Sequence, residues 1–524
     1  NNVDKVTLVT LEFGKTIVTN SLGQRTIYQH AVIGGNNRLL EVRGAGCALC
    51  GETNVRYRYN TAGQLTETVK LSDVGEPIVA QRTAFDKLGR IVLISSIAYV
   101  SGKPTPAQWV TRYDYAGDSY SPNVIARPSV VPGKEVLTRI AYNAAGQPLS
   151  VTETGWVPNL DGSQAAGRIE RTVRYRYSQI NDRSLLTEID GPLPNGKTNT
   201  PADSDITVIE YDNHDNSWVP PTPQLHPSGI AEYAPATRRA GIVTRIIAPG
   251  NFITEVLERD QAQRPVKIRT NDGGVVQVAT VTNNWRGAPL SIDLSAGALR
   301  RQMEFDYTAT GQISAITAPG KLRTTFQYDQ AGRLTRTILP DGSGILTAQD
   351  TEDRVQNVAR FLDAVTPMSD KLPITNFFYD RPIDKPSRLT RICDALGVSA
   401  HYRYTDTGQI AAITNALGIA KTFSYGADGQ LSQRTDADGT RDAASIHMLY
   451  DTAGHATTIT APNGVKTKRV YDDFGQKVLE ADPDHGAKLF RHDAAGHVIA
   501  SIDETLVATR YTFDHADRLI AVGT

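Results

Sequence analysis

A seven-residue motif recurs along this chain at a fixed spacing, and this repetition restricts the folds that the chain can adopt. Tyr328–Leu334 reads Tyr-Asp-Gln-Ala-Gly-Arg-Leu, and related copies begin at Tyr450 and Tyr471. The aromatic position advances in steps of 21 residues within three runs, with one step of 25 residues between 425 and 450. These runs are 307 and 328, then 404 and 425, then 450, 471, 492 and 513. A fixed period predicts that each copy is one supersecondary unit that stacks on its neighbours.

Each repeat is interpreted as a β-hairpin plus a connection. Leu322–Tyr328 is rich in β-branched and aromatic residues, which favour strands. Asp329–Gly332 then supplies a turn, because an aspartate side chain accepts backbone N–H groups and glycine adopts positive φ without strain. Arg333–Leu339 is the returning strand, and Pro340–Ser343 turns the chain again. Seven-residue strands are about 23 Å long, and two strands with two turns leave no room in the period for a helix.

Both faces of such a strand mix polar and apolar side chains. One face carries Leu322, Thr324, Phe326 and Tyr328, and the other carries Arg323, Thr325 and Gln327. Neither face is apolar enough for a sandwich core, so we expect a thin wall with solvent on both sides. We also expect the repeated aromatic side chains to stack from one hairpin to the next. The pattern therefore predicts an all-β fold of tandem antiparallel hairpins in one long sheet.

Composition excludes several classes of function. The chain has 524 residues, too many for one ordinary compact domain, which favours a repeat architecture. Lys and Arg number 55 and Asp and Glu 56, so no long-range field recruits nucleic acid or an anionic membrane. No apolar run approaches the roughly 20 residues that span a bilayer. Arg and Tyr alternate in Arg56–Tyr59 and Arg174–Tyr177, which we attribute to alternating strand faces rather than to stacking on nucleic acid or sugar.

The period divides the chain into three predicted parts. Residues 1–55 form a leading β segment with a Cys-x2-Cys loop, residues 56–300 form divergent repeats with long loop insertions, and residues 301–524 form regular 21-residue repeats that are truncated at the C-terminal end. The period is broken at roughly 95–140, 155–170, 190–250 and 350–400, where we expect long hairpin loops or flaps. Trp218–Pro223 would make a poor central strand, because proline lacks the N–H that the ladder needs.

The three cysteines are Cys47, Cys50 and Cys393. One Cys-x2-Cys pair cannot supply four zinc ligands, and no His-x3-5-His pair lies nearby. Three interpretations of Cys47 and Cys50 stay open: a local disulfide or structural thiol pair, inert reduced thiols, and metal or redox chemistry. Cys393 is interpreted as a small packing residue.

No motif for catalysis, cofactor binding or metal binding is found in the sequence. It has no G-x-S-x-G elbow, H-E-x-x-H pair, phosphate-binding G-x-x-x-x-G-K-[ST] loop or dinucleotide-binding G-x-G-x-x-G that enters a helix. Histidines gather late in the chain, but each is better explained as a substituted repeat position than as a metal ligand: His455, His485, His492, His497 and His515. We therefore predict no catalytic residue, no cofactor and no metal, and we interpret Asp482–Gly486 as an ordinary turn.

The repeat resembles the YD-repeat family, which includes bacterial Rhs proteins, the C components of insecticidal toxin complexes, WapA-like wall proteins and animal teneurins. The likeness runs from about Tyr59 to the last residue, and Leu39–Cys50 also resembles an upstream segment of large bacterial Rhs polypeptides. The positions that carry the repeat signature are Tyr59, Gly63, Tyr142, Gly146, Tyr307, Gly311, Tyr328, Asp329, Gly332, Tyr404, Gly408, Tyr425, Gly429, Tyr450, Asp451, Gly454, Tyr471, Asp472 and Gly475.

The resemblance implies a spiral β-sheet that forms a hollow shell, or part of one, around a C-terminal toxin. It also implies a secreted or cell-surface bacterial protein used in interbacterial competition, whose partners are the enclosed or fused toxin and its delivery machinery. The self-cleaving protease core and the toxin that usually follow the repeats are not recognised in this sequence, so we expect a structural, non-enzymatic stretch. The alternative is an extracellular or cell-surface structural or adhesive element without cargo, which would assemble with itself or bind glycans.

Overall fold

The computed structural model describes residues 7–12, 14–20, 22–46, 53–180, 182–193, 205–212, 218–219, 223–225, 231–233, 237–238, 241–260, 262–363, 372–380, 382–514 and 517–524. Within these residues the fold is all-β, and the only helical segment is one 3-10 turn, η1 (Pro249–Asn251). Among these residues we find no helix with the length and hydrophobicity needed to cross a membrane. The prediction of an all-β fold is confirmed.

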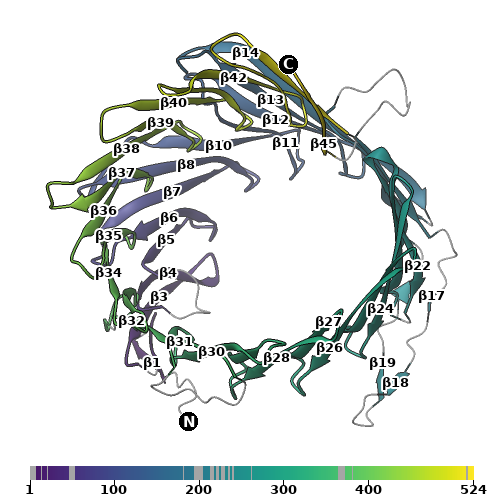
Figure 1. The fold of residues 1–524 in the computed structure, drawn as a ribbon. Helices are drawn as coiled ribbons and strands as arrows, with labels where there is room; N and C mark the ends of the chain where they lie inside the picture. Colours follow the sequence, from purple (N-terminus) through teal and green to yellow (C-terminus); the bar gives the residue numbers. More distant parts are fainter. Residues whose placement is uncertain are drawn as a thin grey trace. The chain divides into compact units, whose positions relative to one another are not determined.

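Forty-one strands are assigned to one antiparallel sheet. Strands that follow each other in the sequence pair with each other, so the sheet is a succession of hairpins, as the repeat predicted. Figure 1 shows this order clearly for the strands from β34 to β38. Two short ladders, β17 with β20 and β18 with β19, stand apart from the main sheet.

The chain divides into two compact units, which are described separately. The first unit contains Asn1–Val136, Trp156–Gly167 and Gln327–Gly486, and the second contains Leu137–Gly155, Arg168–Phe326 and Ala487–Thr524. Five strands contain a boundary between the two units: β12 (Glu135–Tyr142), β13 (Pro148–Pro158), β14 (Ala165–Ile180), β28 (Leu322–Tyr328) and β42 (Gly486–His492).

The first unit consists of two ribbons of hairpins that lie beside each other, as β3 to β10 and β32 to β40 do in Figure 1. The leading ribbon contains β1 (Thr7–Glu12), β2 (Lys15–Thr19), β3 (Arg25–Ile33), β4 (Asn36–Gly44), β5 (Val55–Tyr59), β6 (Leu65–Leu71), β7 (Pro77–Phe85), β8 (Ile91–Val100), β9 (Lys103–Pro104), β10 (Gln108–Tyr115) and β11 (Pro122–Pro128). The trailing ribbon contains β29 (Leu334–Ile338), β30 (Gly344–Gln349), β31 (Val355–Phe361), β32 (Ile374–Tyr379), β33 (Leu389–Cys393), β34 (Ser399–Tyr404), β35 (Ile410–Thr414), β36 (Ala420–Tyr425), β37 (Leu431–Asp438), β38 (Ala444–Tyr450), β39 (Ala456–Thr460), β40 (Lys466–Tyr471) and β41 (Lys477–Asp482).

The second unit continues the hairpin pattern. Its strands are β15 (Arg183–Asp190), β16 (Ile206–Tyr211), β17 (Trp218–Val219), β18 (Pro223–Leu225), β19 (Ala231–Tyr233), β20 (Thr237–Arg238), β21 (Val243–Ala248), β22 (Phe252–Arg259), β23 (Pro265–Asp272), β24 (Val275–Asn283), β25 (Pro289–Ala296), β26 (Leu299–Tyr307), β27 (Ile313–Ala318), β43 (Val498–Ile502), β44 (Ala508–Phe513) and β45 (Leu519–Gly523). Strand β16 pairs directly with β21, so residues 212–242 are an insertion in one hairpin, and it contains the proline-rich segment.

Residues 95–140 do not form one long loop. They continue the sheet through β8, β10 and β11. The period is lost here because strand lengths differ: β8 has 10 residues, β10 has 8 and β11 has 7.

The sheet has little core on either face. Leu322 and its neighbour Arg323 point to opposite faces and are both exposed, while Thr324, Thr325 and Phe326 are only half-buried. Few side chains of the described residues are fully buried, and large apolar side chains such as Leu299 and Leu322 are exposed. This burial pattern agrees with the expectation of a thin sheet with solvent on both sides.

Candidate functional site

The repeat turn at Asp329–Gly332 is fixed by its own aspartate and glycine. The Asp329 carboxylate accepts the amide N–H groups of Ala331 and Arg333, both at 2.9 Å. Gly332 has φ +80° and donates its N–H to the Asp329 carbonyl at 3.0 Å. The Arg333 guanidinium then pairs with the second carboxylate oxygen of Asp329 at 2.7 Å. The predicted roles of the turn aspartate and glycine are confirmed here.

The signature positions predicted from sequence all lie where a strand meets this kind of turn. The tyrosines are each the last residue of a strand: Tyr59, Tyr142, Tyr307, Tyr328, Tyr404, Tyr425, Tyr450 and Tyr471. The glycines all have φ between +77° and +90°: Gly63, Gly146, Gly311, Gly332, Gly408, Gly429, Gly454 and Gly475. Asp451 and Asp472 accept the same two turn amides as Asp329 does. The register shifts by one residue at the tyrosine, as between Asp306 and Tyr307, so the turn also sets a β-bulge.

In several repeats the tyrosine hydroxyl bonds to the repeat before it, a role that the sequence pattern does not indicate. In five repeats it donates to the carbonyl of the first residue of the preceding returning strand. The pairs are Tyr115 with Ile91 at 2.7 Å, Tyr307 with Pro289 at 2.7 Å, and Tyr404 with Leu389, Tyr425 with Ile410 and Tyr450 with Leu431 at 2.8 Å. Burial raises the pKa of Tyr307, Tyr404 and Tyr425. This bond explains why the motif uses tyrosine more often than phenylalanine.

Replacing Tyr425 with phenylalanine is expected to lower the free energy of unfolding by about 1 kcal/mol, because the Ile410 carbonyl loses its side-chain donor. Urea denaturation measures the change. Tyr402→Phe is the control, since the described residues offer its hydroxyl no hydrogen-bond partner. Equal losses in the two variants would contradict the proposed role of the hydroxyl.

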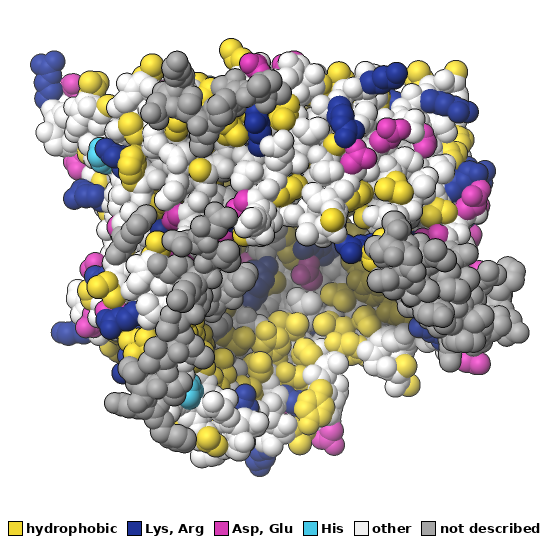
Figure 2. Space-filling view, turned by 90° about the horizontal axis from the view of Figure 1, so that it is seen from below, with side chains coloured by type: hydrophobic (Ala, Val, Ile, Leu, Met, Phe, Trp, Pro, Cys, Tyr) yellow, Lys and Arg dark blue, Asp and Glu magenta, His cyan; other side chains and the backbone are white. Residues whose placement is uncertain are grey.

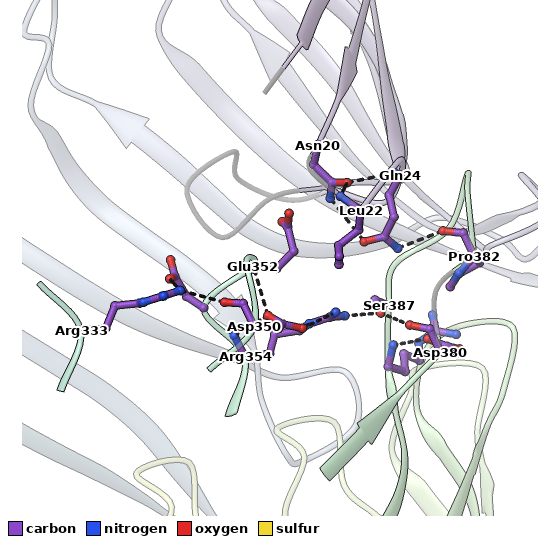
Figure 3. Close-up of polar contacts among 12 residues, drawn as sticks. Asn20, Leu22, Gln24, Arg333, Asp350, Glu352, Arg354, Asp380, Pro382 and Ser387 are labelled. Atoms are coloured by element: carbon purple, nitrogen blue, oxygen red, sulfur yellow. Dashed lines mark hydrogen bonds and ion pairs between the residues drawn. The ribbon is translucent and has the colours of Figure 1, made fainter. Parts of the chain in front are cut away.

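The side chain after the turn glycine connects neighbouring turns. Figure 3 shows Arg333 reaching the next turn, where it donates to the Asp350 carbonyl at 2.8 Å. Arg354 occupies the equivalent position of that turn, binds the Asp350 carboxylate at 2.6 Å and extends to Ser387. Gln409 donates in the same way to the Gly429 carbonyl at 2.8 Å. The turns therefore form a laterally bonded row along the edge of the sheet.

These same side chains cover the aromatic rings of the next repeat. The Arg354 guanidinium lies 4.6 Å from the Tyr379 ring centroid, and the rings of His455 and Tyr471 stack at 4.8 Å. We expected the repeated aromatics to stack on one another directly. In these described repeats, the residue after the turn glycine stacks on the aromatic ring of the next repeat instead. The reason is geometric, because this residue points along the row of turns toward the next hairpin.

The turn glycine also leaves space for this connecting side chain. A Cβ atom on Gly89 would lie 2.9 Å from Gln64 Nε2, and one on Gly408 would lie 3.0 Å from Arg388 Nη2. Glycine is thus favoured here by its positive φ, and the lack of a Cβ atom leaves the end of the connecting side chain undisturbed.

The histidines occupy repeat positions, as the sequence indicated for most of them. His455 Nδ1 lies 3.0 Å from the Asp451 carboxylate, and His497 Nδ1 lies 3.0 Å from Asp493. His492 replaces the tyrosine, and burial lowers its pKa. No group of three or more potential metal ligands occurs among the described residues. Cys393 is a half-buried free thiol at the end of β33. Cys47, Cys50 and His515 lie outside the described residues.

Local hydrogen bonds stabilise the ionised form of several turn aspartates. The Ser343 hydroxyl lowers the pKa of Asp341, and the Thr505 hydroxyl lowers the pKa of Asp503. The Arg90 backbone N–H does the same for Asp86. A lowered pKa in the folded state means that the unfolded chain binds protons first as the pH falls.

We therefore expect these aspartates to make their full contribution to the free energy of unfolding above about pH 5. This contribution should be lost as the pH falls through 4 toward their native pKa values. Urea midpoints at pH 5, 4 and 3 measure the effect, and Asp503→Asn should show a smaller fall than the unmodified protein. A midpoint at pH 3 equal to that at pH 5 would refute this expectation.

The arginines of the alternating segments are engaged in cross-strand ion pairs. Glu67 is buried between Arg58 at 3.2 Å and Arg82 at 2.7 Å, and Arg176 pairs with Glu188 at 2.9 Å. On the face seen in Figure 2, basic and acidic side chains of the described residues lie interspersed. Opposite charges on neighbouring strands thus account for this pattern within the sheet.

The two ribbons of the first unit meet along a row of polar contacts, which we call the seam. At its first contact, Gln24 Nε2 donates to the Pro382 carbonyl at 2.9 Å (Figure 3). The Arg25 backbone N–H donates to the Ile383 carbonyl at 2.7 Å, and its guanidinium pairs with Asp384 at 2.8 Å.

The second seam contact is centred on Asp73, which is 8% exposed. Both terminal nitrogens of Arg388 bind its carboxylate, one of them at 2.9 Å. The Asp73 N–H donates to the Asp406 carbonyl at 2.9 Å, and Asn54 Nδ2 lies 3.4 Å from the carboxylate. This is a two-pronged, largely desolvated ion pair, the geometry in which arginine and carboxylate interact most strongly.

The third seam contact is centred on Asp473, which is 3% exposed. Its carboxylate accepts hydrogen bonds from the Ser129 hydroxyl and the Trp156 N–H, both at 2.7 Å, and from the Val130 N–H at 2.8 Å. Thr452 Oγ1 donates to the Ser129 carbonyl at 3.0 Å.

The seam contacts follow the same order along both ribbons. Arg25 meets Asp384, Asp73 meets Arg388, and Ser129 meets Asp473, with sequence separations of 359, 315 and 344 residues. The trailing ribbon therefore advances in the same direction as the leading ribbon. No local feature of the sequence indicates these pairs.

Comparisons with known proteins agree with this architecture. Residues 307–343 and 404–441 match the family model described as RHS Repeat. No curated protein sequence matches the chain. The crystal structure of TcdB2-TccC3 is similar over 97% of this chain, with a TM-score of 0.64 and 13% identity. The structures of TcdB2-TccC3-Cdc42 and of TcdB2-TccC3 without hypervariable C-terminal region have the same TM-score and coverage at 12% identity.

The chain spans 28% of the length of the first of these structures and 30% of the other two. At this level of identity the likeness concerns the fold. The recurring motif and the family match thus show RHS repeats at residues 307–343 and 404–441, and the chain shares its fold with the TcdB2-TccC3 structures.

Proposed function

We propose that this chain is a wall segment of an Rhs shell that encloses or presents a C-terminal toxin or effector for delivery. The observation that carries the proposal is the thin sheet, in which few side chains of the described residues are fully buried on either face. A sheet of this kind is not the core of a globular domain, and it is suited to separate one compartment from another.

The seam supports the wall interpretation. If the turns at a sheet edge made no contact with the next ribbon, the two ribbons would not hold together as a wall. Here the turns of one ribbon bind those of the other through buried polar groups. Because both ribbons advance in the same direction, further rows can be added by the same kind of contact. We infer that this is how a spiral sheet becomes a continuous wall.

The remaining parts of the proposal follow from the shell role. The stretch itself acts as a structural element and not as an enzyme, and its partners are the enclosed or fused toxin and the delivery machinery. A secreted or cell-surface location accords with such a role. The competing possibility, an adhesive or filamentous element without cargo, is an outcome of the tests below.

Limited proteolysis of the complete polypeptide that contains this wall tests the proposal. We expect the segment that follows the repeats to resist protease in the intact protein and to be cleaved rapidly once the seam is opened by Arg388→Ala. The Arg441→Ala variant is the control, because this side chain is 94% exposed. Equal cleavage of the cargo segment in all three proteins would favour the cargo-free alternative.

A further inference from the structure

The seam contacts of three different trailing turns share one position. Each of these three turns has four residues that follow the aromatic residue, and the second of the four contacts the leading ribbon. Asp406 accepts the Asp73 N–H through its carbonyl, Thr452 donates to the Ser129 carbonyl, and Asp473 binds through its carboxylate. In the repeat motif this position is variable, since Gln330 and Ala494 occupy it elsewhere.

We propose that the side chain at this variable second position determines which trailing repeat fits a given place on the seam, as the contacts of Thr452 and Asp473 indicate, and that Asp473 fixes the register. The Asp473 backbone takes part as well, with its N–H donating to the Trp156 carbonyl at 3.1 Å and its carbonyl accepting from Arg127 at 2.6 Å. A carboxylate this buried is tolerated only when it is fully hydrogen-bonded.

The cradle for this carboxylate is built by the leading segments themselves. The Ser129 hydroxyl also accepts the Val131 N–H at 3.0 Å, which orients it. The Trp156 indole N–H donates to the Glu135 carbonyl at 3.1 Å, and the Lys134 ammonium lies 4.6 Å from the Trp156 ring centroid. Two amides and one hydroxyl are thereby held in place for an acceptor with two oxygens.

The cradle discriminates against neighbouring repeats. A slip of one repeat, 21 residues, would bring Thr452 or Ala494 to the position of Asp473. Threonine has one oxygen and alanine has none, so two or three donors would be left buried without a partner. Unsatisfied buried donors are costly, and the correct register is therefore favoured over the nearest alternatives.

Hydrogen exchange of the Val130 and Trp156 amides in the full chain tests the proposal. In Asp473→Ala both amides lose their acceptor, and we expect their exchange to accelerate by about tenfold or more. Gln330→Ala is the matched control, because it changes the same turn position at an exposed site and should leave both rates unchanged. Unchanged protection of both amides in Asp473→Ala would overturn the proposal.

A milder variant keeps the test valid if Asp473→Ala fails to fold. Ser129→Ala removes one of the three donors and should accelerate exchange of the same two amides by a smaller factor. Where both variants fold, Ser129→Ala should have no further effect in the Asp473→Ala background, because the acceptor is already absent. Independent, additive effects of the two substitutions would show that the carboxylate and the cradle do not act together.

Discussion

Replacing Arg388 with alanine is expected to destabilise the first unit by about 3–5 kcal/mol, because it leaves the Asp73 carboxylate buried without its cation. Asp73 is 8% exposed, and both terminal nitrogens of Arg388 bind it. The substitution also removes the guanidinium that lies 5.5 Å from the Tyr404 ring centroid. The free energy of unfolding in urea is the quantity to measure.

Two further variants separate this effect from a general loss of charge. Arg441→Ala removes an arginine whose side chain is 94% exposed, and it should change stability by no more than about 0.5 kcal/mol. Combining Arg388→Met with Asp73→Asn removes both charges and should recover much of the loss, as replacing both members of a buried pair often does. A loss in Arg388→Ala no larger than in Arg441→Ala would mean that the pair contributes little.

Replacing Phe361 with alanine is expected to cost about 3–5 kcal/mol, the range for removing a fully buried aromatic side chain. Phe361 is 2% exposed at the end of β31, opposite Gly344 of β30. A Cβ atom on Gly344 would lie 2.6 Å from Phe361 Cζ, so the glycine makes room for the ring. The Arg336 guanidinium covers the ring at 4.5 Å from its centroid.

The neighbouring residue provides the control for this cavity. Leu362 is 90% exposed, and Leu362→Ala should change the urea midpoint very little. In a thin sheet the few fully buried side chains provide a large share of the packing. The loss of stability should therefore be much larger in Phe361→Ala than in Leu362→Ala. Comparable midpoints for the two variants would contradict the assignment of Phe361 to the core.

The repeat fold was predictable because its determinants are local. A turn such as Asp329–Gly332 is specified by residues within five positions of one another, and strand alternation is read directly from the sequence. The register of each hairpin follows from the turn, as the shift at Tyr307 shows. The division of the chain at residues 55 and 300 stays a prediction.

The seam was not predictable from the sequence, because its partners are far apart. Asp473 and Ser129 are separated by 344 residues, Ser129 lies outside the repeat motif, and the motif leaves the position of Asp473 variable. Asp473 looks like one of many polar turn residues until the structure places it against the cradle. Similarly, the tyrosine hydroxyl and the residue after the turn glycine act on the adjacent hairpin, a contact that strand periodicity does not describe.

Electron microscopy of the intact protein is the most direct test of the central claim that these repeats build a shell wall. We expect a closed, hollow particle whose wall is one sheet thick, with additional polypeptide density inside. An extended ribbon or filament, or a solid globule without an internal space, would contradict it.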